Sequence, residues 1–355
     1  MTFRFLTAGE SHGQAVTAIV EGLPSGVPLN IDSINHELSL RQSGFGRSQR
    51  MTLEKDTVQI LSGIKNHQTL GFPITLLISN KDTKNLDALP KLTSPRPGHA
   101  DLVGTLKFNH DDVRNSLERA SARETAIRTA VGALCQNFLN EFHVSFLARV
   151  IQIGPLPATS KTEKKIKNLI QTCKSKGETL GGIFEICVKG LPLGLGNFSQ
   201  WDLKLDGRLA QAVMSIPAIK GVEFGAGFQG ASLLGSKAHD DIFYDKKSKK
   251  NFGYVRKTLR SGGLEAGVTT GQDLILRAAM KPLSTLTQKP LNSINMVTKE
   301  KTKALVQRTD TCAVWAASIV AKNVVAIELT RAFLEKFGGD SLEETRNNYK
   351  NYLVP

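Results

Sequence analysis

The apolar positions of the chain recur at helical spacing in two long stretches. Between residues 121 and 140 they fall three and four residues apart, which predicts a helix with one buried face. The stretch 312–337 is apolar on almost every side and predicts a longer, deeply buried helix that ends at Gly338 and Gly339. Shorter helices are predicted over 31–40, 158–180 and 206–216.

Strand-like stretches, rich in β-branched residues, surround these helices. They alternate with the helices too irregularly for a doubly wound parallel sheet, and no Gly-x-Gly-x-x-Gly motif follows the first strand. The pattern therefore predicts an α+β fold with mostly antiparallel strands and a few long buried helices. The predicted strands are two within 3–24, joined by a turn at 7–13, and others at 57–64, 72–79, 144–153, 183–189, 221–227 and 274–280.

Composition places the chain among globular proteins. Its 355 residues are 40% hydrophobic, which is enough for a substantial core, yet no run is long and apolar enough to span a bilayer. The N-terminal residues enter a strand-like pattern with no signal or transit segment, so a cytoplasmic location is expected. The cysteines Cys135, Cys173, Cys187 and Cys312 are scattered without paired spacing, which predicts reduced thiols and no metal site.

The formal net charge is +14, from 46 Lys and Arg against 32 Asp and Glu. Such a charge permits a nucleic acid, an acidic membrane surface or a polyanionic small molecule as partner. Lysines cluster in loop-like segments such as 161–167 and 246–250, whereas arginines lie in Gly-, Pro- and Ser-containing turns beside predicted helix starts. Aromatic residues are only 6% and are not interleaved with the basic ones, as base stacking would need. A polyanionic small molecule is therefore favoured, nucleic-acid binding is the alternative, and no membrane contact is expected.

Candidate acid–base chemistry is concentrated in the irregular segments. His12 and His99 each lie in a glycine-containing turn, and an imidazole can give and take protons near neutral pH. A single histidine in a turn is more often a surface residue, but the same setting twice favours acid–base work. Asp310, just before the long C-terminal helix, is the candidate carboxylate.

The candidate anion-binding residues are cations in the same kind of segment. A guanidinium can hold a carboxylate or phosphate through two parallel hydrogen bonds. If these cations converged without an anion, their repulsion would destabilise the fold, so convergence implies a ligand with several negative charges. The set comprises Arg41, Arg47, Arg50, Arg96, Arg123, Lys281 and Arg308.

Motifs over essentially the whole chain resemble those of the chorismate synthase family. Several long motifs in the right order are far more specific than any one of them. The resemblance implies a single domain of this family over residues 1–355. The motifs are at 8–13 (Ala-Gly-Glu-Ser-His-Gly), 96–101 (Arg-Pro-Gly-His-Ala-Asp), 120–125 (Ala-Ser-Ala-Arg-Glu-Thr), 218–223, 261–263, 281–282 and 308–310.

This resemblance implies a fold, a reaction and a cofactor. The implied fold has long helices sandwiched between antiparallel sheets, and members are usually homotetramers. The implied reaction is the anti-1,4-elimination of phosphate from 5-enolpyruvylshikimate 3-phosphate to give chorismate, the last common step of aromatic amino-acid biosynthesis in the shikimate pathway. The reaction requires reduced FMN although it has no net redox change. No reductase motif is visible, so the sequence leaves open whether the protein reduces its flavin with NADPH or receives reduced FMN.

The resemblance also implies roles for individual residues. His12 would protonate the leaving phosphate, His99 would protonate the reduced flavin near N1, and Asp310 would relay the proton at flavin N5. The implied substrate contacts are Ser11, Arg41, Arg47, Arg50, Arg96, Arg123 and Arg308. The implied flavin contacts are Arg119, Ala120, Ser121, Pro217, Ala218, Ala266, Lys281, Pro282, Leu283, Ser284, Thr285 and Arg308.

Some positions depart from a common family pattern. The run 115–118 replaces a glycine run seen in some members, and Pro217 stands where Asn is frequent. Ala266 stands where Gly is frequent, and Thr309 where His is frequent. These departures concern individual flavin contacts more than the reaction, because backbone groups can bind a flavin whatever the side chain.

Two alternatives to a flavin-dependent lyase remain at this point. One is a nucleic-acid-binding protein that uses the positive charge. The other is a flavin-binding or assembly protein that keeps the fold but has lost turnover, against which the joint presence of His12, His99 and Asp310 argues. The segments 41–50 and 236–260 are the candidates for loops that close over the ligands.

Overall fold

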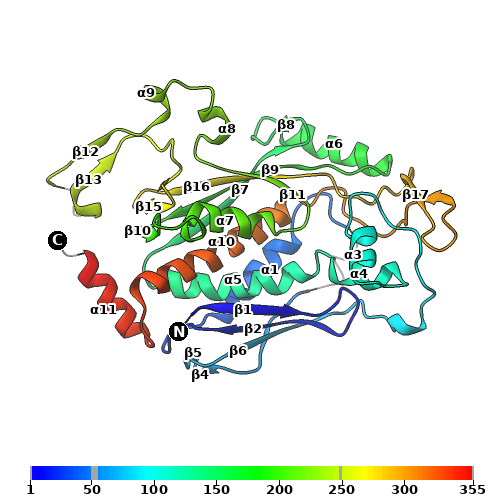
Figure 1. The fold of residues 1–355 in the computed structure, drawn as a ribbon, viewed down its shortest axis with the longest axis horizontal. Helices are drawn as coiled ribbons and strands as arrows, with labels where there is room; N and C mark the ends of the chain where they lie inside the picture. The colour runs from blue at the N-terminus through cyan, green and yellow to red at the C-terminus, as the bar shows by residue number, and fades with distance from the viewer. Residues whose placement is uncertain (1, 49–54, 248–249, 354–355) are drawn as a thin grey trace.

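The computed structural model describes residues 2–48, 55–247 and 250–353. Figure 1 shows that helices α5 (Glu124–Asn140) and α10 (Val314–Phe337) lie side by side between two antiparallel sheets, with α1 (Ile31–Gln42) beside them. Almost every side of α10 is buried, which fits a helix enclosed by other elements. The expected fold, with long helices between antiparallel sheets, is confirmed.

The two sheets have the strand orders β1-β2-β6-β3 and β11-β16-β9-β7-β8. Neighbouring strands pair antiparallel in both. Alternate residues of β6 and β16 are fully buried, because successive side chains point to opposite faces and one face covers the helices. The strands are β1 (Arg4–Ala8), β2 (Ala15–Glu21), β3 (Gln59–Ile60), β6 (Ile74–Ser79), β7 (Ser145–Ile153), β8 (Leu156–Pro157), β9 (Gly182–Lys189), β11 (Ile219–Phe224) and β16 (Leu274–Met280).

A buried polar network fixes the helices relative to one another. Lys322 Nζ on α10 donates to Glu37 Oε1 on α1 (2.6 Å), and Asn323 Nδ2 donates to Glu37 Oε2 (2.8 Å). Gln136 Nε2 on α5 donates to Asn323 Oδ1 (2.7 Å). Gly132 lets α5 approach α10 here, since an added Cβ would lie 2.3 Å from the carbonyl oxygen of Asn323. The helices α1, α5 and α10 are thereby held in a fixed relation.

Several elements differ from the sequence-based prediction. Within 57–64 only β3 and the first residue of the short β4 are strand, because a bend at Ser62-Gly63 interrupts it. The stretch between His99 and α5, for which no helix was predicted, contains α3 (Asp101–Lys107) and α4 (Val113–Arg119). Such helices are too short to produce a periodic signal. The polar C-terminal tail forms α11 (Leu342–Leu353), on which Tyr349 packs against Phe337.

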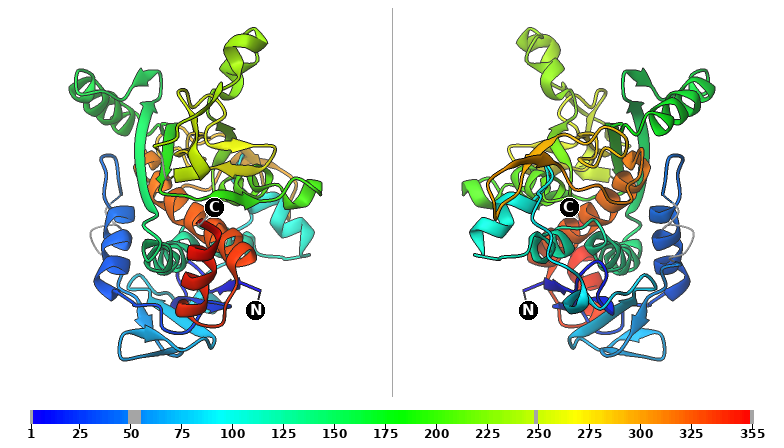
Figure 2. Two further views of the ribbon diagram at one scale, coloured as in Figure 1. Left: turned by 90° about the vertical axis from the view of Figure 1, so that its left-hand side faces the viewer. Right: turned by 90° about the vertical axis from the view of Figure 1, so that its right-hand side faces the viewer.

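Two segments project from the sandwich in Figure 2: the lysine-rich α6 (Glu163–Ser175), and the region that includes α8 and α9. The exposed helix predicted over 158–180 is confirmed. The stretch 236–260 was expected to be a loop, but it contains the β12–β13 hairpin. The remaining elements are β4 (Ile64–Lys65), β5 (Gln68–Thr69), η1 (Leu86–Ala88), β10 (Leu193–Gly196), η2 (Trp201–Leu203), α7 (Leu205–Met214), α8 (Gly227–Gly230), α9 (Gly235–Ala238), β12 (Ile242–Tyr244), η3 (Lys250–Gly253), β13 (Tyr254–Arg256), β14 (Leu264–Glu265), β15 (Val268–Thr270), β17 (Asn292–Ile294) and β18 (Lys301–Lys303).

The cysteines are all free thiols. Burial raises the pKa of Cys135 to about 12 and that of Cys312 to about 11, so both stay protonated at neutral pH. Within the described ranges no group of three or more His, Cys, Asp or Glu side chains could hold a metal ion. Over the same ranges, no helix combines the length and the apolar character needed to cross a membrane.

Candidate active site

A cavity of about 410 Å³ brings together most of the residues singled out from the sequence. Its wall comes from the β1–β2 turn, the segment after α1, the segment before α3, the α4–α5 junction, and the segments at 283–285 and 307–310. This size is typical of a small-molecule site. The sequence-predicted residues that line it are Ser11, His12, Arg41, Arg47, Arg96, His99, Ser121, Arg123, Leu283, Ser284, Thr285, Arg308 and Asp310.

A tight turn between β1 and β2 carries His12 to this cavity. Gly9 in the turn has a φ of 107°, and an added Cβ would lie 2.3 Å from the carbonyl oxygen of Ala15. His12 Nδ1 lies 2.9 Å from both carboxylate oxygens of Glu118, a buried residue of α4. Burial alone would raise the pKa of Glu118, but the hydrogen bonds and charge of His12 outweigh it and lower that pKa below its usual range.

His99 is anchored in the same way by a different carboxylate. Its Nδ1 lies 2.5 Å from Asp101 Oδ1, in the first turn of α3. Asp101 also accepts hydrogen bonds from the backbone N–H (3.0 Å) and Nε (2.8 Å) of Arg96. Burial alone would raise the pKa of Asp101, but its hydrogen bonds to His99 and Arg96 outweigh burial and hold that pKa well below its usual range. The carboxylate therefore stays ionised, and it fixes the orientation of both His99 and Arg96.

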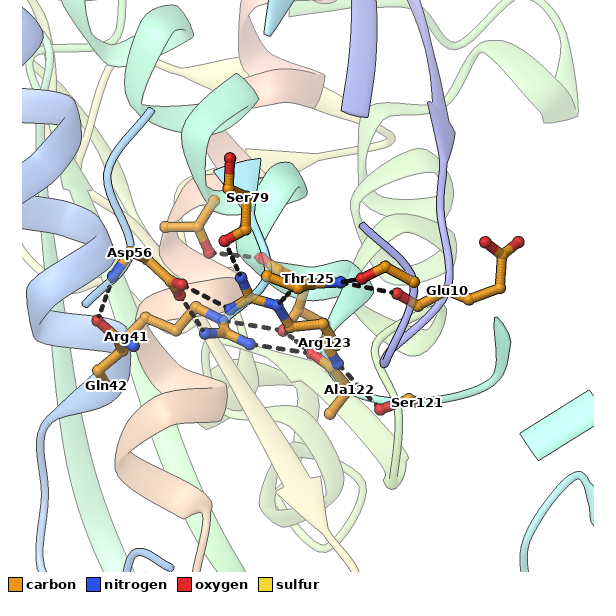
Figure 3. A network of polar contacts seen from close by, with 12 residues as sticks. Glu10, Arg41, Gln42, Asp56, Ser79, Ser121, Ala122, Arg123 and Thr125 are labelled. Carbon is orange, nitrogen blue, oxygen red and sulfur yellow. Dashed lines mark hydrogen bonds and ion pairs between the residues drawn. The ribbon is translucent and has the colours of Figure 1, made fainter. Parts of the chain in front are cut away.

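Arg41 and Arg123 share one buried carboxylate, as Figure 3 shows. Arg123 Nη1 donates to Asp56 Oδ1 (2.6 Å), and Arg41 Nη1 donates to Asp56 Oδ2 (3.2 Å). Arg123 Nε donates to Asn80 Oδ1 (2.6 Å), and Arg41 Nε donates to Thr125 Oγ1 (3.1 Å). Burial lowers the pKa of Arg41 to about 10, with Asp56 opposing the change and Arg123 adding to it. Arg41 therefore remains charged at neutral pH.

The remaining arginines of the cavity also contact carboxylates. Arg47 Nη1 lies 3.0 Å from Asp310 Oδ2, and the backbone N–H of Ser48 donates to Asp310 Oδ1 (2.6 Å). Arg308 donates to Asp82, whose carboxylate also lies 3.7 Å from His12 Nε2. Asp310 is thus held in place by the loop after α1.

These contacts correct one expectation from the sequence. Convergence of the cations was expected to need the anions of a ligand, but the described arginines at the cavity each contact a protein carboxylate. Asp56, Asp82, Asp101 and Asp310 offset much of their charge. The site is therefore stable without a ligand, and each guanidinium is oriented before an anion arrives.

Some predicted residues do not line the cavity. Arg119 donates to the carbonyl oxygens of Thr7 (3.1 Å) and Gly9 (3.3 Å), so it supports the turn that carries His12. Lys281 Nζ donates to the carbonyl oxygen of Gly98, and its backbone N–H donates to that of Ala218 (2.9 Å). Arg50 lies outside the described residues. The others that do not line the cavity are Ala120, Pro217, Ala218, Ala266 and Pro282.

The carboxylates that contact these histidines and arginines, apart from Asp310, were not predicted from the sequence. Asp101 ends the motif at 96–101, two residues after His99, so the sequence could have indicated that its carboxylate contacts His99. Asp56, Asp82 and Glu118 had no such signal, because they are far in the chain from their partners and resemble ordinary helix or loop residues. The cavity-lining residues that were not predicted are Ser48, Lys84, Leu117, Ala122, Gln307 and Thr309.

The fold and the site together are typical of an enzyme with a small-molecule substrate. Two carboxylate-anchored histidines and several oriented guanidiniums face one small cavity, which is a combination suited to proton transfer on an anion.

Comparison with known proteins identifies the family. The sequence model of the chorismate synthase family matches residues 3–334. The chorismate synthase of Caldanaerobacter subterraneus subsp. tengcongensis is 51% identical over 353 residues, which cover 99% of this chain and 98% of that protein. The chorismate synthase of Geotalea uraniireducens is 48% identical, with coverage of 99% and 98%. A crystal structure of a chorismate synthase superposes with a TM-score of 0.81 at 39% identity, covering 99% of this chain and 98% of that chain. The chain belongs to the chorismate synthase family, a family of lyases, as its motifs predicted.

Proposed function

We propose that the protein forms chorismate by 1,4-elimination of phosphate from 5-enolpyruvylshikimate 3-phosphate, with reduced FMN as cofactor. The observation that carries this proposal is the single cavity lined by both anchored histidines, Asp310 and the arginines, in a chain of this family. The substrate has two carboxylates and a phosphate, which match oriented guanidiniums. Chorismate formation belongs to aromatic amino-acid biosynthesis.

The arginines and His12 would act on the substrate. Arg41, Arg123 and Arg47 would bind its anionic groups, since each lines the cavity with its orientation fixed by a carboxylate. His12 would give a proton from Nε2 to the leaving phosphate, because its Nδ1 is engaged by Glu118. A positioned proton donor of this kind contributes about 10²–10⁴-fold to a rate.

Further residues that line the cavity fit a flavin mononucleotide. Ser121, Ser284 and Thr285 offer hydroxyl donors and Arg308 a guanidinium, which suit a phosphate and the polar edge of a flavin. The apolar lining there comes from Leu117 and Leu283. Reduced FMN, when bound, would supply electron density to the substrate as phosphate leaves.

Two further side chains would hold protons beside the cofactor. His99 has Nδ1 engaged by Asp101, and its Nε2, which lies 3.3 Å from Arg96 Nη2, is the ring nitrogen that would exchange protons. Asp310 keeps a fixed position through Arg47 and the backbone N–H of Ser48, so its carboxylate can accept and release a proton without moving. Both assignments follow the family resemblance.

An anaerobic assay tests the proposed function. With chemically reduced FMN and the phosphorylated substrate, we expect chorismate and phosphate in equal amounts, and no product with oxidised FMN alone. Adding NADPH to oxidised FMN shows whether the protein reduces its own flavin. Flavin binding without any chorismate from reduced FMN would contradict the proposal and favour a protein that has lost turnover.

We also propose the homotetramer that the resemblance implies, in the cytoplasm. Leu6 and Ile19 lie opposite each other on β1 and β2 and are 74% and 50% exposed, so an apolar part of the first sheet faces outward. Burying such a surface between subunits would stabilise an assembly. Light scattering is expected to give a mass about four times that of the 38.6 kDa chain. A monomeric mass at micromolar concentration would contradict it.

A further inference from the structure

Glu118 makes more contacts with the His12 turn than any role in packing requires. Its carboxylate accepts from the backbone N–H of His12 (2.9 Å) and lies 2.9 Å from Nδ1 of the same residue. Its carbonyl oxygen accepts from the backbone N–H of Ser11 (3.1 Å). The side chain is only 3% exposed, so water competes little for these bonds.

This geometry determines which ring nitrogen of His12 serves the cavity. An ionised carboxylate can only accept hydrogen bonds. The Nδ1 atom of His12 therefore carries a hydrogen and donates a hydrogen bond to Glu118. Nε2 is then the nitrogen that exchanges protons on the open side, where Asp82 lies 3.7 Å away. His12 itself lines the cavity. The pairing therefore fixes both the tautomer and the direction of the ring.

Among the described residues, charged groups near His12 come from three elements besides its own turn. Glu118 belongs to α4, Asp82 and Lys84 to the segment after β6, and Arg308 to the segment before α10. Arg308 contacts Asp82, so each offsets much of the other's charge. Glu118 is a buried carboxylate in direct contact with the ring, and such a contact stabilises an imidazolium.

Glu118 ends the run 115–118, which stands where some members of the family have glycines. A glycine has no side chain to contact the histidine, so the carboxylate–histidine pair depends on the glutamate of this chain.

We propose that Glu118 is a positioning residue that keeps His12 protonated and aimed at the leaving phosphate. This inference rests on the proposed role of His12. During elimination the C–O bond to phosphate breaks with its electron pair on the leaving oxygen, the Nε2–H bond breaks, and an O–H bond forms on phosphate. His12 is left neutral, still donating Nδ1–H to Glu118, and solvent returns a proton to Nε2 before the next turnover.

Replacing Glu118 with glutamine tests this role. Glu118→Gln keeps the shape and one acceptor but removes the charge, so the imidazolium loses its stabilising partner. We expect the NMR titration midpoint of His12, assigned by its loss in His12→Ala, to fall by at least about one pH unit. The high-pH limb of the kcat profile should move to lower pH by the same amount, because the active form is the protonated one. Activity near pH 6 should change much less than activity at pH 8.

Matched variants separate this role from simple support of the turn. Glu185→Gln removes an equally buried carboxylate that pairs with Arg149 and Arg277 away from the cavity, and both readouts should stay at wild-type values. Glu118→Asp retains the charge, so the NMR titration midpoint of His12 in this variant should lie closer to the wild-type value than in Glu118→Gln. Should Glu118→Gln not fold, Glu118→Gly is expected to show the same downward shift.

Two outcomes have distinct meanings. An unchanged His12 midpoint and pH profile in folded Glu118→Gln or Glu118→Gly overturns the inference, even when His12→Ala has lost turnover. Full turnover by His12→Ala instead removes the proposed role of His12 and, with it, the inference.

Discussion

Replacing Asp56 with asparagine is expected to lower the free energy of unfolding by about 3–5 kcal/mol, as for a buried ion pair that loses one partner. The Asp56 carboxylate is fully buried and contacts both Arg41 and Arg123, whose side chains are only 5% and 3% exposed. Without it, two buried guanidiniums would face each other across an uncharged amide. Denaturant titration followed by circular dichroism measures the loss.

A bound anion should recover part of this stability, because Arg41 and Arg123 also line the cavity. Inorganic phosphate is therefore expected to raise the melting temperature of Asp56→Asn more than that of the wild type. Asp111→Asn is the control: Asp111 pairs with Lys91 at the surface, and its loss should leave stability unchanged. Wild-type stability in Asp56→Asn would show that the two arginines do not depend on this carboxylate.

Substituting alanine for either cavity histidine is expected to reduce turnover by at least about tenfold, and by up to about 10⁴-fold, while the fold is retained. His12 and His99 would each lose a proton-transfer group whose Nδ1 is bound to a buried carboxylate. Because neither ring belongs to the apolar core, near-native circular dichroism is expected. Steady-state assays with reduced FMN measure kcat and KM separately.

The control for this pair is His36→Ala, an exposed histidine on α1 that does not line the cavity. Its turnover should equal that of the wild type. Wild-type turnover in both cavity variants would exclude acid–base roles for these residues. A rise in KM at constant kcat would instead indicate that the imidazoles only bind the substrate.

The elements with a strong periodic pattern could be predicted from the sequence. The helices expected over 121–140 and 312–337 are α5 and α10, and the strand expected over 274–280 is β16. Burial along β16 alternates with the strand period, and α10 is buried on almost every side as its long apolar sequence predicted, so local sequence carries the information. The helices α3 and α4 were not predicted, because seven residues are too few to establish a period.

The sequence by itself determined the family, the main helices and strands, and the histidines and arginines that meet at one cavity, because these lie in local motifs. Only the tertiary structure decided which carboxylate serves each of them. Glu118 lies 106 positions from His12, and Asp82 lies 226 positions from Arg308. No local pattern encodes such a pairing, since it depends on how α4 and the segment after β6 pack against the rest of the chain. The expected cluster of arginines is therefore a set of ion pairs, and Glu118, a buried carboxylate outside that set, has the proposed role of orienting His12.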